Sequence, residues 1–311
     1  MIGRIVEVAD DRRYLFVSRG FMVVQDTDGE RKELGQVPLD DIAAVIANAH
    51  GLSYSNNLLV ALAARGAPFV LCAANHNAVG MLWPVDGNFQ QAKRFDAQLA
   101  ASKPTHKRLW AEIVRAKLQQ QAAALEAAGA LFVPVAALAA KVRSGDPGNL
   151  EAQGARRYWG LLFGEDFRRD QNGGGVNGML NYGYTVLRAA TARAIIAAGL
   201  HPTLGLHHCN EGNAMRLVDD LMEPFRPMID LIVWQLQRKG ESQVTPDTKR
   251  VLVRSLYDDM QTSSGTTPMM VCMQRLAISL AQVYLGERDR LDLPLPGLPL
   301  VLAANLAADD D

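Results

Sequence analysis

The side chains best suited to chemistry lie between Leu204 and Pro227, in the stretch LGLHHCNEGNAMRLVDDLMEPFRP. It opens with two adjacent histidines, His207 and His208. Three acids follow on a segment whose apolar residues recur at helical spacing, so we predict a helix over 213–223. These acids are Asp219, Asp220 and Glu223. Because residues three and four apart share a helix face, we expect the acids on one patch.

Three like charges on one patch repel one another, and the helix dipole disfavours anions near a helix C-terminus. Pro224 and Pro227 are expected to kink or end the helix at this point. A divalent cation among the acid oxygens would relieve the repulsion, and a histidine nitrogen could complete its ligands. The alternative is that Arg216 pairs with Asp219 and Asp220 on a solvated surface. This stretch alone leaves both interpretations open.

A further acid, Glu151, lies just inside a helix that we expect to begin after Asn149, a good helix cap. Arg156 and Arg157 flank it on neighbouring faces of that helix. An acid in the first turn of a helix is stabilising by about 0.3–1 kcal/mol without any further role. Glu151 taken alone is therefore explained as well by helix stability as by chemistry.

Composition sets broad limits on the class of protein. The chain has 311 residues, 49% of them hydrophobic, and a net charge of −1, which neither demands nor excludes nucleic acid. We find no apolar run of the roughly 20 residues needed to span a membrane, and no signal peptide. The cysteines Cys72, Cys209 and Cys272 suit neither a CxxC pair nor a disulfide framework, so we expect a reduced, cytoplasmic protein.

The order of patterns predicts an α+β protein. Residues 1–90 alternate in the manner of strands and form a β-rich domain. Residues 91–103 are polar and are assigned as a linker. Residues 104–290 show helical periodicity almost throughout and form an all-α domain, with 240–268 read as polar and turn-rich. Residues 291–311 are Pro-rich, then acidic, and are expected to be a docked or disordered extension.

Three segments of the helical part resemble one known family. LGLHHCN followed by LVDDLMEPFRP, the upstream GNLEAQGARRYW and the intervening VNGMLNYGYTVLRA are similar to motifs of the Cas1 family. Members of that family are CRISPR-associated endonucleases and integrases that insert new spacers. The resemblance covers most of the chain, and the form DLMEPFRP resembles the group associated with type II systems. It implies a β-rich dimerisation domain followed by an α-helical catalytic domain.

The resemblance also implies a metal site. Its catalytic residues and metal ligands would be Glu151, His208 and Glu223. His208 is preferred to His207 because it lies fifteen residues before Glu223, which is similar to the family spacing. Asp220 matches a position that is often acidic, and would be a fourth ligand or a residue beside the ligands, whereas Asp219 is assigned to the surface. Carboxylates with one imidazole suit Mg²⁺ or Mn²⁺.

The reaction implied is attack by the 3′-hydroxyl of a short DNA fragment on a phosphodiester at the edge of a CRISPR repeat. The metal would help to ionise that hydroxyl and neutralise charge on the phosphoryl oxygens. Candidates for holding the DNA backbone near the metal are Arg143, Arg156, Arg157 and Arg188, although exposed helix ends and ordinary ion pairs explain each arginine equally well. The expected partners are double-stranded DNA, a second copy of the chain, Cas2 and the type II effector nuclease.

Two other functions fit parts of the pattern. The first is a non-catalytic scaffold that binds DNA ends while another protein cuts. The second is a zinc hydrolase that uses His207, His208 and Cys209, but three adjacent residues cannot easily converge on one ion. Loss of strand transfer on removal of Glu223 would separate the integrase from the scaffold.

Overall fold

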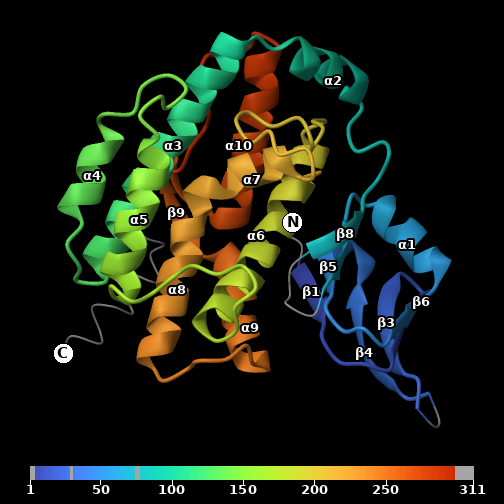
Figure 1. Cartoon of the computed structure of the whole chain (residues 1–311). Helices are drawn as coiled ribbons and strands as arrows, with labels where there is room; N and C mark the ends of the chain where they lie inside the picture. Colours follow the sequence, from blue (N-terminus) through green and yellow to red (C-terminus); the bar gives the residue numbers. More distant parts are fainter. Residues whose placement is uncertain (1–3, 29–30, 74–77, 298–311) are drawn as a thin grey trace.

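The computed structural model describes residues 4–28, 31–73 and 78–297, and a strand-rich region precedes a helical one (Figure 1). This confirms the predicted fold class. The N-terminal region has two four-stranded sheets. One holds, in spatial order, β4 (Glu33–Pro38), β3 (Phe21–Asp26), β2 (Arg13–Ser18) and β6 (Leu52–Tyr54). The other holds β1 (Arg4–Val8), β5 (Ile42–Ala47), β7 (Phe69–Cys72) and β8 (Ala78–Leu82).

Strand β5 lies between two hydrophobic cores, which explains its sequence. All six residues of IAAVIA are buried, as expected for a strand covered on both faces. Ile42 and Val45 face the core of the N-terminal region, together with helix α1 (Asn56–Ala63), whose N-terminus is capped by Ser55. Ile46 faces the larger core of the helical region. The two regions are thus packed against each other through this sheet.

The helical region is built around α3 (Lys103–Ala127), which contacts α4, α5, α8 and the 3-10 turn η2. The other elements are α2 (Gln91–Ala100), α4 (Val133–Ala139), α5 (Leu150–Phe163), α6 (Val176–Ala197), α7 (Arg216–Met222), η2 (Glu223–Phe225), α8 (Arg226–Arg238), α9 (Pro246–Arg254) and α10 (Met269–Tyr284). Within the part of the chain that the structure describes, no helix is both long enough and apolar enough to cross a bilayer.

Several segments differ from the sequence-based expectation. The segment 91–103, assigned as a linker, contains α2. The segment 240–268 contains α9, followed by the short turn η3 (Ser255–Tyr257) and a hairpin of β9 (Asp259–Thr262) and β10 (Gly265–Pro268). The helical region is therefore not purely helical. Helix α9 begins with a capping box formed by Thr245 and Thr248, which polar composition alone did not reveal.

The start of the C-terminal extension is docked on the helical region. Leu291 is buried, and the backbone N–H of Leu295 donates to the carbonyl of Gln261. The rest of the extension, residues 298–311, lies outside the described residues, so its docking stays a prediction.

Candidate active site

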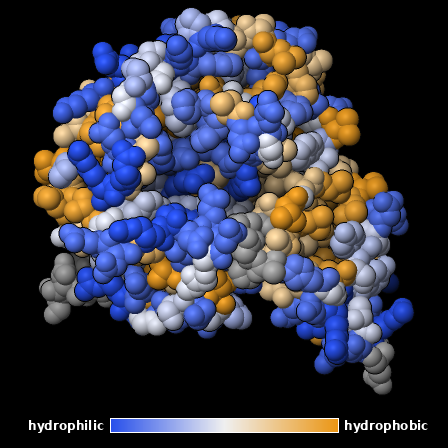
Figure 2. Space-filling model, in the orientation of Figure 1, coloured by the Kyte–Doolittle hydropathy of each residue, from blue (hydrophilic) through white to orange (hydrophobic). Residues whose placement is uncertain are grey.

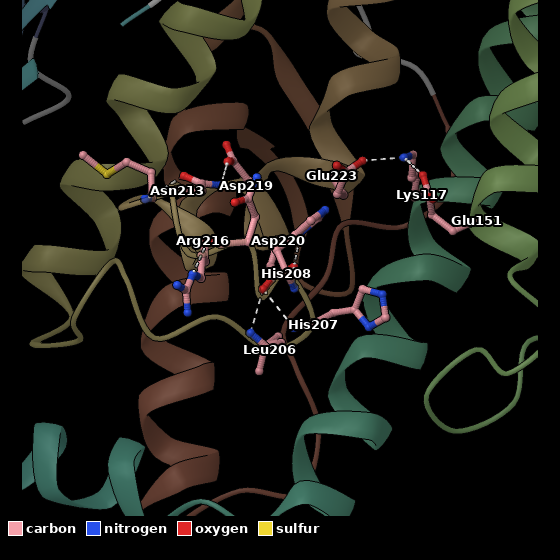
Figure 3. Close-up of polar contacts among 12 residues, drawn as sticks. Lys117, Glu151, Leu206, His207, His208, Asn213, Arg216, Asp219, Asp220 and Glu223 are labelled. Atoms are coloured by element: carbon pink, nitrogen blue, oxygen red, sulfur yellow. Dashed lines mark hydrogen bonds and ion pairs between the residues drawn. The ribbon is translucent and has the colours of Figure 1, made fainter. Parts of the chain in front are cut away.

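The acid-bearing helix is shorter than predicted, and its three acids do not share one patch. Helix α7 runs over Arg216–Met222 rather than from residue 213, and η2 turns the chain before α8 begins. Pro224 and Pro227, which lack a donor N–H, lie in the first turns of η2 and α8, where they favour this break. The acids consequently point to three different sets of partners (Figure 3).

Asp219 is not the free surface acid that was expected. Its Oδ2 accepts hydrogen bonds from Arg188 Nη2 and Asn213 Nδ2, both at 2.7 Å. Arg216, the alternative partner, donates instead from Nε to the Asn210 carbonyl at 2.8 Å. Asp219 thus has donors of its own within the chain, and these relieve the repulsion from its neighbours.

Asp220 is fully buried and holds the loop that carries the histidines. Its Oδ2 accepts from the backbone N–H of Leu206 at 2.6 Å and of His207 at 3.2 Å, and its Oδ1 accepts from the backbone N–H of His208 at 3.4 Å. Gly205 allows this close wrapping, because a Cβ there would lie 2.9 Å from both Asp220 Oδ2 and the His208 carbonyl. Both oxygens of Asp220 are thus used by the protein, which favours the predicted role beside the ligands over that of a fourth ligand.

The two histidines are directed to different places. His208 Nδ1 lies 2.6 Å from Asp220 Oδ1, and this hydrogen bond raises the pKa of His208. A carboxylate on Nδ1 fixes the ring and leaves Nε2 available, which is the usual arrangement around a metal-binding histidine. His207 instead stacks on Trp110, with ring centroids 4.4 Å apart and planes 1° apart. The structure therefore distinguishes the two rings, and the choice of His208 as a ligand stays a prediction.

Glu151 enters the site from α5, whose start is capped differently from the prediction. Asn149 adopts a left-handed conformation with φ 48° and makes no side-chain cap. Asp146 takes that role, because its two oxygens accept from the backbone N–H groups of Leu150 and Glu151, each at 2.9 Å. The close packing of α5 on α3 then brings Glu151 against Lys117.

Lys117 joins the two predicted acidic ligands, and sequence reasoning missed it. Its Nζ contacts Glu151 Oε1 and lies 2.5 Å from Glu223 Oε2 (Figure 3). Burial alone would lower the pKa of Lys117, but Glu223 and Glu151 raise it. Burial would raise the pKa of Glu223, but Arg226 and Lys117 lower it. In the sequence, Lys117 is one of several lysines and arginines between residues 93 and 117, and nothing there marks it as buried.

These side chains line a cavity of about 750 Å³ that is rich in polar groups. In Figure 2 hydrophilic side chains surround a hollow near the centre of the face shown. Among the residues lining the cavity are the three predicted ligands and four basic side chains, Lys117, Arg169, Arg188 and Arg226. Ala78 of β8 also lines it, so the N-terminal region contributes to its wall.

Of the four arginines predicted to hold DNA near the metal, Arg188 alone lines this cavity. Arg143 and Arg156 are exposed elsewhere, and Arg157 donates to the Pro134 carbonyl at 3.3 Å. On α5 the residues that face the cavity are Glu151, Ala155 and Trp159, so the intervening arginines point away from it. Their contact with DNA outside the cavity stays a prediction.

A buried acid, Asp230, lines the cavity together with Glu151, His208 and Glu223. Asp230 is 2% exposed and accepts a hydrogen bond from Tyr184 at 2.5 Å. Burial raises the pKa of Asp230 to about 7. Arg226 and Arg169 lie over the Tyr184 ring, at 4.9 and 5.2 Å from its centroid. Asn181 and Tyr184 of α6 thus line the same cavity as the residues of α5, and the sequence alone gave no signal for this.

Two carboxylates and an imidazole are a suitable donor set for Mg²⁺ or Mn²⁺. Both carboxylates already converge on one cationic nitrogen, and His208 is oriented by a buried acid, so the residue types fit a divalent ion. As the side chains lie, however, the described residues contain no group of three His, Cys, Asp or Glu close enough to hold a metal. That finding also covers His207, His208 and Cys209, and gives the zinc alternative no support.

Known proteins match nearly the whole chain. The family described as "CRISPR associated protein Cas1" matches residues 6–142 and 148–254. A CRISPR-associated endonuclease Cas1 from Neisseria meningitidis serogroup C is 37% identical over 269 residues, which is 85% of this chain and 88% of that protein.

Solved structures share the fold. A casposase bound to its integration product has a TM-score of 0.78 at 19% identity, covering 93% of this chain and 92% of that one. A Cas1 protein from Thermotoga maritima has a TM-score of 0.73 at 15% identity, covering 92% and 99%. A Cas6-RT-Cas1–Cas2 complex has a TM-score of 0.72 at 15% identity, covering 95% of this chain and 36% of that one.

Proposed function

This chain belongs to the Cas1 family of CRISPR-associated proteins, and from that premise we propose that it is a metal-dependent DNA endonuclease and integrase. Its substrate would be a short DNA duplex whose 3′-hydroxyl attacks a phosphodiester at the edge of a CRISPR repeat. The observation that supports this most is the convergence of Glu151 and Glu223 on the Lys117 ammonium group, in a polar cavity that is also lined by His208.

In this proposal Glu151, Glu223 and His208 Nε2 would hold Mg²⁺ or Mn²⁺. When bound, the ion would supply Lewis-acid activation of the hydroxyl and of the phosphoryl oxygens. Asp220 fixes the His208 ring through Nδ1 and keeps Nε2 toward the cavity. Arg188 and Arg169 line the same cavity, where their guanidinium groups can hold phosphate oxygens. No side-chain nucleophile is required, because the DNA provides the attacking oxygen.

We further propose that the protein acts as a homodimer with Cas2 and double-stranded DNA, and that the type II effector nuclease joins this complex. Pull-down experiments with each partner would test this. The family relationship supports Cas2 and DNA as partners. Exposed apolar side chains on the second N-terminal sheet, Leu71 at 40% and Val79 at 71%, support an interface between copies there. Light scattering of the full chain, alone and with Cas2, tests this assembly.

The activity is tested by strand transfer of a pre-spacer duplex into a repeat-containing plasmid, with Mn²⁺ and with or without Cas2. Glu223→Gln keeps the side-chain volume but removes the charge, and should reduce strand transfer roughly a thousandfold, equivalent to about 4 kcal/mol of barrier. DNA affinity should remain close to that of the wild type. Glu165→Gln, an exposed acid beyond α5, is the matched control and should be fully active. Unchanged strand transfer in Glu223→Gln would favour the DNA-binding scaffold instead.

A further inference from the structure

Lys117 is a cation that the fold itself places between the two proposed acidic ligands. Its side chain is 9% exposed, and the carboxylates that it contacts come from different elements, Glu151 from α5 and Glu223 from η2. Glu223 is buried, at 6% side-chain exposure, and also pairs with Arg226 at 3.3 Å, whereas Glu151 is 27% exposed. Two such carboxylates without a counter-charge between them would be destabilising. Lys117 therefore supplies, within the chain, the positive charge that a divalent ion would otherwise supply.

A lysine in this place cannot stay there when a divalent ion binds. A metal and an ammonium group would compete for the same carboxylate oxygens, and the two cations would repel at contact distance. For the ion to bind, the Lys117 Nζ must move to another acceptor within reach of its flexible side chain.

The structure provides such an acceptor one helical turn further along α3. Gln121 is 2% exposed, and its Oε1 is a buried acceptor without a hydrogen-bond partner among the described residues. Residues four apart on a helix face each other, so the carbonyl oxygen is within reach of the lysine. Gln121 and Lys117 both line the cavity that contains the acids. A buried unpaired acceptor is costly, and an arriving ammonium group would satisfy it.

We propose that Lys117 is a tethered counter-ion that holds Glu151 and Glu223 together in the metal-free protein and transfers to Gln121 when the metal binds. This inference rests on the metal site of the proposed function. Lys117 is then a positioning residue. It keeps the acids gathered before the ion arrives, and it weakens the apparent affinity for the ion, because only the lysine-free fraction of molecules can bind it.

The test measures Mn²⁺ binding by calorimetry and thermal unfolding of the full chain, without DNA. Lys117→Met should lower the unfolding temperature of the metal-free protein by about 5–10 °C, because it breaks a buried ion pair. It should also bind Mn²⁺ roughly tenfold more tightly, because the competing cation is gone. A purely structural lysine would lower the stability and leave the affinity unchanged or weaker, and that result would overturn the proposal. Lys107→Met, an exposed lysine on the same helix, is the matched control.

A second variant keeps the test decisive if Lys117→Met does not fold. Gln121→Met removes an unpaired buried acceptor, so it should fold at least as well as the wild type. It should bind Mn²⁺ several-fold more weakly, because Lys117 loses its second position, and this effect should vanish in the Lys117→Met background. Unaltered affinity in Gln121→Met would overturn the transfer to Gln121.

The metal site itself is tested separately, by Mn²⁺ binding to the wild type and to Glu223→Gln. If the wild type binds Mn²⁺ and Glu223→Gln does not, the proposed metal site stands whatever the Lys117 and Gln121 variants show. If the wild type binds no Mn²⁺, both proposals fail.

Discussion

At the scale of single residues, the site depends on side chains that orient other side chains. Asp220 does not line the cavity, yet it fixes three backbone N–H groups and the ring of His208. Such a buried carboxylate behind a histidine typically changes metal affinity or activity by 10–100-fold when it is removed. The residues that matter for chemistry thus extend beyond the three predicted ligands.

Asp220→Asn should therefore reduce strand transfer by about 10–100-fold. It should also return the pKa of His208 toward its ordinary value, because the charged hydrogen-bond partner that raises this pKa is lost. NMR titration of the histidine ring in the metal-free protein measures the shift. Asp219→Asn is the control, since Asp219 pairs with Arg188 and raises the His208 pKa less than Asp220 or Glu223 does. Equal effects of the two substitutions would contradict the specific role of Asp220.

Asp230 should make stability depend on pH in the direction opposite to that of a salt-bridged acid. The folded protein holds a proton on Asp230 up to about pH 7, whereas the unfolded chain releases it near 3.8. Between these values the unfolded state binds fewer protons, so the free energy of unfolding falls as pH rises. Asp230→Asn has no such loss. Its free energy of unfolding, relative to that of the wild type, should therefore increase between pH 4 and pH 8 by about 4 kcal/mol.

Urea unfolding at pH 4, 6 and 8 measures that difference. The exposed acid Asp247, at 80% side-chain exposure, gives the control variant Asp247→Asn, which should show no such trend. A constant difference between Asp230→Asn and the wild type across the range would show that Asp230 stays ionised in the folded protein.

At the scale of elements, the packing of α5 on α3 sets the distance between Glu151 and Lys117. Gly154 allows the close approach, because a Cβ there would lie 2.2 Å from Leu118 Cδ2. Leu118 is fully buried and has little room to move. We expect Gly154→Ala to destabilise the protein by about 1–3 kcal/mol and to weaken Mn²⁺ binding, because α5 must shift away from α3.

Gly160→Ala provides the comparison within the same helix. A Cβ at Gly160 would have no neighbour within 4 Å, so alanine should be neutral or stabilising by up to about 1 kcal/mol. Thermal unfolding and calorimetric Mn²⁺ titration of both variants measure the outcome. If the two variants behaved alike, helix propensity rather than helix packing would explain the effect.

The way in which helices and loops pack together also explains which parts of the site could be predicted from the sequence. Motif resemblance was sufficient to select Glu151, His208 and Glu223, and the structure brings them to one cavity. The divergence of Asp219 and Asp220 depends on a loop folded over α7, which local spacing does not reveal. Lys117 could not be distinguished from the exposed lysines near it, because burial of one face of α3 is a tertiary property. Asp146 replaced Asn149 as the cap for a similar reason, since the conformation of the loop decides which side chain reaches the free N–H groups.

At the scale of the whole molecule, a buried polar network connects the strand-rich and helical regions. Glu7 of β1 accepts hydrogen bonds from Tyr182 of α6 and Asn48, each at 2.7 Å, and pairs with Lys249 of α9 at 2.8 Å. The Lys249 ammonium also lies 5.3 Å from the Tyr182 ring centroid. Because β8 contributes Ala78 to the cavity wall, the junction helps to define the shape of the site.

The strength of this junction is best measured by a double-mutant cycle on Glu7→Gln and Lys249→Met. Their side chains are only 13% and 12% exposed, so we expect each single variant to destabilise the protein by about 3 kcal/mol and the coupling energy to exceed roughly 1 kcal/mol. The exposed pair Arg12 and Asp28 lies 2.8 Å apart with 71% and 60% exposure, and its cycle should give a much smaller coupling energy. Glu7→Gln should also expose backbone amides of β1 and α9 to hydrogen exchange while those of α3 stay protected, because the junction would open before the helical core unfolds. Uniform loss of protection throughout the chain would instead show that the two regions unfold as one cooperative unit.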